Sequence, residues 1–243
     1  MKRCSSRFLC SLFLLMTVTP SSTQTVKFSR HDYPANSGPF SVTATDVNGD
    51  GFADLLVGNT IFQQGVTVLL NNHDGTFTPP IESISHDQSA DIVAIADMNG
   101  DGKPDVVFVD RFHFSISVMY GNGDGTFQLP VRAFFGGPNP NSLALADFNG
   151  DGRVDIVWAR EGGAATASPP ALRMMLNTGN DAQGHAQFAA PVDLLTSTDS
   201  TQNFFSVTTG DLNGDGKPDL AFLICCSSNP ATPVIATEAF GHA

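Results

Sequence analysis

Short apolar runs alternate with acidic, glycine-rich turns along this chain, and the arrangement recurs four times. Before each acidic turn, apolar and smaller residues alternate, as in DIVAIA at residues 91–96 and NSLALA at residues 141–146. After each turn comes a continuous apolar run, such as DVVFV from Asp105 or DIVWA from Asp155. Period-two alternation is typical of β-strands, and short apolar runs between turns indicate strands covered on both faces. The pattern predicts an all-β chain.

A second turn follows in each of the first two units. NNHDGTF ends at Phe77 and GNGDGTF ends at Phe127, and Asp-Gly between apolar runs is a strong hairpin signal. A looser version, NTGNDAQGHAQF, ends at Phe188 in the third unit. Each unit therefore reads as strand, acidic loop, strand, strand, Asp-Gly turn and strand. Four strands in about 50 residues match the size of one propeller blade.

These units predict a β-propeller-type array of about four four-stranded blades. The array is either an incomplete ring or part of a larger propeller. A second interpretation also remains, in which the chain is a truncated piece of a longer array. Phe28 lies 18 residues before Asp46, at the place of a fourth strand, so a strand there could complete the last blade and close the ring. Gly 23, Pro 15 and only 15% charged residues also favour many short strands over helices.

The N-terminus has the features of a secretory signal peptide at residues 1–22. Lys2, Arg3 and Arg7 precede an apolar stretch from Phe8 to Val18, and small residues follow it. That stretch is shorter than the roughly 20 residues that span a bilayer. We therefore expect residues 23–243 to form the repeat domain, in an extracellular (or periplasmic) location, with no membrane span.

Charge and cysteine content restrict the classes of ligand and partner that this chain can bind. The chain has a formal net charge of −12, and loss of the three basic signal residues leaves nine basic against 24 acidic residues, or −15. This excess argues against nucleic acid as a partner and fits cation binding. Only the adjacent Cys225 and Cys226 remain after cleavage. They either stay as free neighbouring thiols, or form a vicinal disulfide or soft-metal site.

The acidic loops carry the candidate chemistry. They read D-x-N-G-D-G-x-x-D at residues 46–54, 97–105, 147–155 and 211–219. Oxygen donors at alternate positions, with glycines for a sharp turn, suit Ca²⁺, which takes six to eight oxygen ligands. The loops contain no His or Cys, which argues against zinc. An EF-hand is excluded because its twelfth position needs a Glu, where these loops have Val57, Phe108, Trp158 and Phe222. The alternative is a set of solvated turns with nothing bound.

The segment VAIADMNGDGKPDVVFVD, followed by ISVMYGNGDGTF, resembles the FG-GAP, or VCBS-type, repeat, which is related to the N-terminal propeller of integrin α-chains. The resemblance extends from about Phe28 to Leu223. It implies calcium-stabilised blades in extracellular adhesion proteins, lectin-like proteins and accessory modules of larger enzymes. Propellers of this type commonly have seven blades, and the tail after Leu223 loses the pattern, so we expect a poorly formed fourth blade.

The resemblance also implies up to four Ca²⁺ ions, one in each loop. The residue at the seventh position of each loop would contribute only its backbone carbonyl. The implied ligands are Asp46, Asn48, Asp50, Phe52 and Asp54; Asp97, Asn99, Asp101, Lys103 and Asp105; Asp147, Asn149, Asp151, Arg153 and Asp155; and Asp211, Asn213, Asp215, Lys217 and Asp219.

The function expected from these features is a secreted, non-catalytic, calcium-binding module for adhesion or for recognition of a glycan or protein ligand. No nucleophile, zinc or phosphate-loop motif is present, and the histidines share no repeat position. Two alternatives stay open: a fragment or accessory module of a larger secreted enzyme, and a hydrolase in its own right. An oligomer that completes the ring is a further possible assembly.

Overall fold

The computed structural model describes residues 30–35, 38–61, 65–83, 89–136, 140–162, 169–197, 202–226 and 234–238. The expected signal peptide and the expected strand at Phe28 lie outside these residues. The described part of the chain is all-β and contains no helix, as the alternation of apolar and polar positions predicts. Consistent with this, it contains no helix long and apolar enough to cross a membrane.

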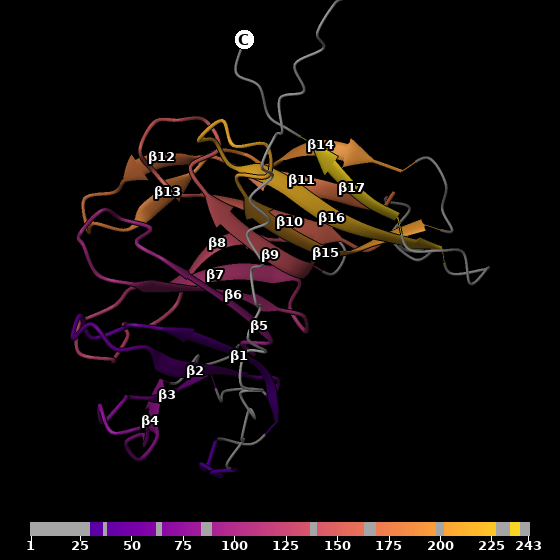
Figure 1. Ribbon diagram of the computed structural model, residues 1–243. Helices are drawn as coiled ribbons and strands as arrows, with labels where there is room; N and C mark the ends of the chain where they lie inside the picture. Colours follow the sequence, from indigo (N-terminus) through magenta and orange to yellow (C-terminus); the bar gives the residue numbers. More distant parts are fainter. Residues whose placement is uncertain are drawn as a thin grey trace, which may run out of the picture. The chain divides into compact units, whose positions relative to one another are not determined.

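Antiparallel strands form three four-stranded blades and one three-stranded blade, with a small extra hairpin on the third (Figure 1). The first blade contains β1 (Pro39–Thr45), β2 (Asp54–Asn59), β3 (Val66–Leu69) and β4 (Ile81–Ser83), and the second contains β5 (Ile92–Ala96), β6 (Asp105–Asp110), β7 (Ser115–Met119) and β8 (Val131–Phe135). The third contains β9 (Pro140–Ala146), β10 (Asp155–Arg160), β11 (Ala171–Met175) and β14 (Val192–Thr196), with the hairpin β12 (Asn177–Asn180) and β13 (Ala186–Phe188). The fourth contains β15 (Gln202–Gly210), β16 (Asp219–Cys226) and β17 (Val234–Glu238).

The connections follow the order that the repeat predicts. Each acidic loop joins the first two strands of its blade, and the Asp-Gly turns join the third and fourth strands of the first two blades. In the third blade the looser turn opens into the β12–β13 hairpin. The fourth blade has three described strands instead of four, as a weakened repeat there predicts, but the tail after Leu223 still supplies β17, which pairs with β16 from Leu220 to Ile224. Strand pairing uses the backbone, so it does not require the side-chain pattern of the other blades.

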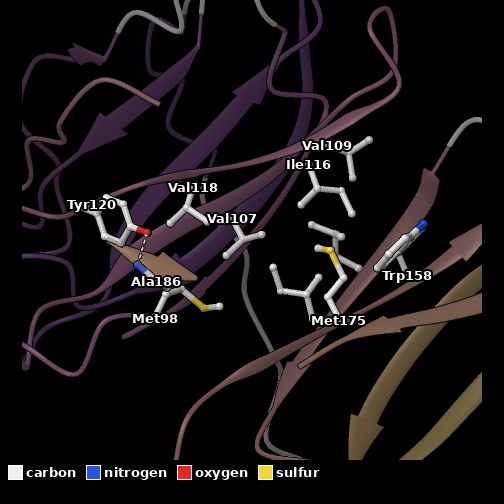
Figure 2. Packing of buried hydrophobic residues seen from close by; sticks show 11 residues of the cluster. Met98, Val107, Val109, Ile116, Val118, Tyr120, Trp158, Met175 and Ala186 are labelled. Atoms are coloured by element: carbon white, nitrogen blue, oxygen red, sulfur yellow. Dashed lines mark hydrogen bonds between the residues drawn. The ribbon is translucent and has the colours of Figure 1, made fainter. Parts of the chain in front are cut away.

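The core lies between consecutive blades. Successive side chains of a strand point to opposite faces, so each inner strand contributes to two interfaces. In the second blade Val93 and Ile95 pack toward the first blade, whereas Ile92 and Ala94 pack toward the third. Figure 2 shows the cluster between the second and third blades, in which the fully buried Trp158 contributes the largest side chain.

Neighbouring blades meet mainly along their first strands. β1 lies beside β5, β5 beside β9, and β9 beside β15. Among the described strands the ring is not closed. The fold is therefore a propeller-type array whose first and last blades each have one face that no other described blade covers.

Candidate functional site

The first acidic loop is organised around the side chain of Asp46. Its Oδ1 accepts hydrogen bonds from the backbone N–H groups of Gly49, at 2.7 Å, and Asp50, at 3.2 Å, and its Oδ2 accepts one from Gly51, at 2.8 Å. Gly49 and Gly51 have φ angles of +77° and +87°, a region that side chains with a Cβ rarely enter. The two glycines thus let the backbone wrap around the first carboxylate.

The same wrapping recurs in all four loops. In each, the first Asp accepts three backbone N–H groups from the fourth, fifth and sixth positions. The Asn at the third position accepts the N–H of the fifth residue, and the Asp at the fifth position accepts the N–H of the seventh. Local hydrogen bonds therefore give the four loops one shared conformation.

The Asp at the ninth position is placed differently, because it is buried in every blade. In the second blade, Asp105 Oδ2 accepts the N–H of Met98 at 2.8 Å and Oδ1 accepts the N–H of Gly121 at 2.9 Å. Asp54 and Asp155 make the equivalent pairs of bonds. This carboxylate thus fastens the acidic loop to the end of the third strand.

Burial shifts the proton affinity of two of these carboxyl groups. Desolvation raises the pKa of Asp105 to about 6, against its ordinary value of 3.8, and the nearby Asp101 and Asp97 add to the shift. Desolvation likewise raises the pKa of Asp155. A buried acid with neighbouring carboxylates is a costly negative charge, which a cation in the same loop would offset.

The donor chemistry of the loops fits a hard cation. Each loop offers carboxylate, amide and carbonyl oxygens only, and an ionised carboxylate has about four lone pairs, so accepting two or three N–H groups leaves acceptor capacity. In the side-chain arrangement shown, no group of three or more His, Cys, Asp or Glu among the described residues is placed to hold a metal ion. Calcium in these loops therefore stays a prediction.

Two basic side chains near the loops were not apparent from the sequence pattern. His73 Nε2 lies 2.9 Å from Asp50 Oδ2 and its ring stacks on Phe52 at 3.9 Å between centroids. This hydrogen bond is the largest contribution that lowers the pKa of Asp50. In the third loop the Arg153 guanidinium pairs with Asp151 Oδ2. The first and third loops thus carry a basic group at the fifth-position carboxylate, which a bound cation would have to compete with.

A pocket lies at the other ends of the strands, away from the acidic loops. Thr60 follows β2, Asp91 precedes β5, and Arg111 and Phe112 form the turn between β6 and β7; these four residues line a cavity of about 280 Å³. Phe112 is 66% exposed, whereas Asp91 is buried. The guanidinium of Arg111 lies 5.9 Å from the ring centroid of Phe40. The pocket therefore combines an aromatic face, a cation, a hydroxyl and a carboxyl group.

Asp91 of this pocket also belongs to a buried polar cluster. Ser89 Oγ lies 3.1 Å from both Asp91 Oδ2 and Asp110 Oδ1, and His113 Nδ1 lies 2.6 Å from Asp110 Oδ2. Desolvation, with the nearby Asp110, raises the pKa of Asp91. Ser89 is fully buried, so its hydroxyl is not accessible as a nucleophile. No repeat pattern marks these residues, because among the described parts of the blades only the second carries them.

Together, the repeated blades and their shared loops define a propeller-type repeat protein. The family comparison agrees: the FG-GAP-like repeat matches residues 59–108 and 97–158, and the FG-GAP repeat matches residues 38–69 and 203–222. The chain therefore belongs to the FG-GAP repeat proteins, as its motifs predict. No curated protein sequence matches the chain.

Solved structures support the fold. A lectin from Agrocybe aegerita, described as specific for non-reducing terminal N-acetylglucosamine, superposes with a TM-score of 0.53 at 20% identity, covering 84% of this chain and 53% of the lectin. An intramolecular trans-sialidase from Ruminococcus gnavus gives a TM-score of 0.51 at 13% identity, covering 80% of this chain and 42% of that enzyme. This chain thus spans about half the length of these proteins or less, and at such identities the likeness shows the propeller fold alone.

Proposed function

We propose that this protein is a secreted recognition module, without a catalytic site of its own, whose acidic loops each hold one Ca²⁺ ion. The observation that carries the proposal is the single conformation shared by four loops with the same oxygen donors. FG-GAP repeats are in general non-catalytic, and the Ser89 hydroxyl, which lies beside Asp91 and Asp110, is fully buried. Secretion rests on the signal-like N-terminal sequence.

The first, third, fifth and ninth side chains of each loop and the carbonyl of the seventh residue would hold the ion. Bound Ca²⁺ would offset two of the three negative charges that the neighbouring carboxylates of each loop carry. Extracellular calcium modules have dissociation constants of about 10⁻⁴ to 10⁻³ M, so at about 1 mM calcium the tighter limit gives roughly 1.4 kcal/mol per site. Four independent sites would add about 6 kcal/mol, which is comparable with the whole stability of a domain.

Calorimetric titration with CaCl₂ tests the metal part of this proposal. We expect Asp101→Asn to weaken or abolish one binding event, because it removes a carboxylate from the second loop. Asp124→Asn is the matched control, since Asp124 is an exposed aspartate in the Asp-Gly turn of the same blade. Absence of calcium binding by the unaltered protein, or equal loss in both variants, would contradict the proposal.

A glycan is the ligand class that the pocket of Thr60, Asp91, Arg111 and Phe112 fits best. An exposed aromatic ring can stack on the apolar face of a sugar, and a few converging polar groups can fix its hydroxyls. The cavity of about 280 Å³ is near the lower size of small-molecule sites. The Agrocybe aegerita lectin, which shares the fold, gives a terminal N-acetylglucosamine as the first ligand to test.

Binding to a glycan array tests this assignment. We expect Phe112→Ala and Arg111→Ala to lower binding at least tenfold, while Leu129→Ala, which removes an equally exposed apolar side chain elsewhere on the second blade, leaves it unchanged. Array binding that survives both pocket substitutions would place the ligand elsewhere. Hydrolysis of an array glycan, retained when the loop aspartates are replaced, would refute the non-catalytic assignment.

A further inference from the structure

Residues at equivalent positions of the repeat lie on the same face of their blades. Val42, Val93, Leu143 and Val207 each lie four residues before the first aspartate of their loops. In the second, third and fourth blades this residue packs against the preceding blade, and Leu143 and Val207 are only 9% and 4% exposed. Val42 holds the same position in the first blade and is 66% exposed. The face that buries its counterparts is therefore open at β1.

The opposite face is open in the fourth blade. The residues ten positions after the first aspartate are Leu56, Val107, Val157 and Ala221. The first three are fully or almost fully buried against the following blade, whereas Ala221 is half-buried. Instead of a neighbouring blade, Ala221 meets a groove of about 290 Å³, which is lined by Ser206, Thr208, Ala221, Phe222 and Leu223.

The side chains on the two open faces have complementary sizes, as the side chains at the internal interfaces do. On each inner strand the residue three positions before the loop is small (Thr43, Ala94, Ala144 and Thr208), and the residue four positions before it is larger (Val42, Val93, Leu143 and Val207). Within the chain, the larger side chain of one blade packs against the small ones of the blade before it. The groove beside Thr208 lacks its larger partner, and the exposed Val42 lacks a small-residue face.

We propose that the groove on the fourth blade receives β1 of a second copy of this chain. The contact repeats the inner-strand part of the internal blade-to-blade packing in trans and joins copies head to tail. Because the two surfaces differ, the interface is heterologous, and copies add until a ring closes or a filament forms. Val57 and Leu69, which share the face of Val42, are already buried. The docking contact is therefore confined to the inner strand, where the internal blades also meet.

Light scattering coupled to size-exclusion chromatography tests this assembly with the secreted chain in calcium buffer. We expect the unaltered protein to form a species larger than a monomer, with a mass that depends on concentration. Val42→Asp, which blocks the open face of the first blade, and Ala221→Asp, which blocks the groove, should each give monomers. Leu129→Asp, at an exposed apolar residue away from both faces, should assemble like the unaltered protein.

An equimolar mixture of the two blocked variants gives the sharpest outcome. Each variant retains the surface that the other has lost, so the mixture should form dimers and nothing larger. Circular dichroism confirms that both variants are folded, which separates a lost interface from a lost fold. A monomeric unaltered protein at 100 µM would overturn the proposal. Assembly retained by Ala221→Asp alone would overturn it in favour of a symmetric contact through the first blade.

Discussion

The buried aspartate at the ninth loop position should stabilise its blade even without calcium. Asp105 has both carboxylate oxygens within 2.9 Å of a backbone nitrogen, one in the acidic loop (Met98) and one just after β7 (Gly121). Asp105→Ala leaves both N–H groups without their acceptor in a buried place. The substitution therefore tests whether this carboxylate ties two loops together or serves a bound ion alone.

The expected loss follows from the two bonds. A buried donor left without a partner costs about 1–3 kcal/mol, so two cost about 2–6 kcal/mol. Part of this cost is offset, because burial raises the pKa of Asp105 to about 6, and alanine removes the desolvation penalty of the buried charge. We therefore expect a net loss of about 2–4 kcal/mol, a large share of the 5–15 kcal/mol that stabilises a typical domain.

Urea unfolding in excess EDTA measures this loss with no calcium present. Asp124→Ala is the control, because it removes an exposed carboxylate from the same blade and should change stability by less than about 1 kcal/mol. If Asp105→Ala unfolds like the unaltered protein in EDTA and differs only with calcium, the ninth-position aspartate is a ligand and the reasoning from its hydrogen bonds is wrong.

Three further predictions each concern a single residue. Arg153→Gln should raise the calcium affinity of the third loop severalfold in calorimetric titration, because Asp151 loses a competing cation; unchanged affinity would show that the pair is broken in solution. Burial raises the pKa of Asp91 above 3.8, so the native state binds that proton more tightly than the unfolded state, and stability should fall as pH rises through the raised pKa. Asp91→Asn should reduce this fall in chelator-containing melts and leave the part that Asp105 and Asp155 contribute, and an identical pH profile would refute the assignment. Trp158→Ala should cost about 3–5 kcal/mol in urea unfolding, since the indole is fully buried, and a loss below 1 kcal/mol would contradict the packing between the blades.

The repeated elements of this fold could be predicted because each is specified locally. Alternation at residues 92–96 and the apolar run from Asp105 match β5 and β6, and the Asp-Gly turn ending at Phe127 matches the bridge between Gly121 and Phe127. Four aligned copies remove the ambiguity of any one of them. The fourth blade was harder, because β17 pairs through its backbone in a segment without the repeat pattern.

The surroundings of the loops and the pocket could not be predicted in the same way. His73 reaches Asp50 across 23 residues, and the pocket brings together Thr60, Asp91 and Arg111 from two blades. These contacts depend on how blades and turns pack, and no repeat position marks them. The sequence also does not distinguish an aspartate that is free to bind a cation from one, such as Asp105, whose oxygens already accept backbone hydrogen bonds.

Thermal unfolding of residues 23–243 in 1 mM calcium and in excess EDTA tests the central claim most directly. Four sites that together contribute about 6 kcal/mol should raise the midpoint of a cooperative transition by about 10 °C or more, since 1 kcal/mol corresponds to roughly 2–4 °C for a chain of this size. A rise of this order, lost with the loop substitutions, is the predicted result. The same midpoint in both buffers would contradict calcium-stabilised blades.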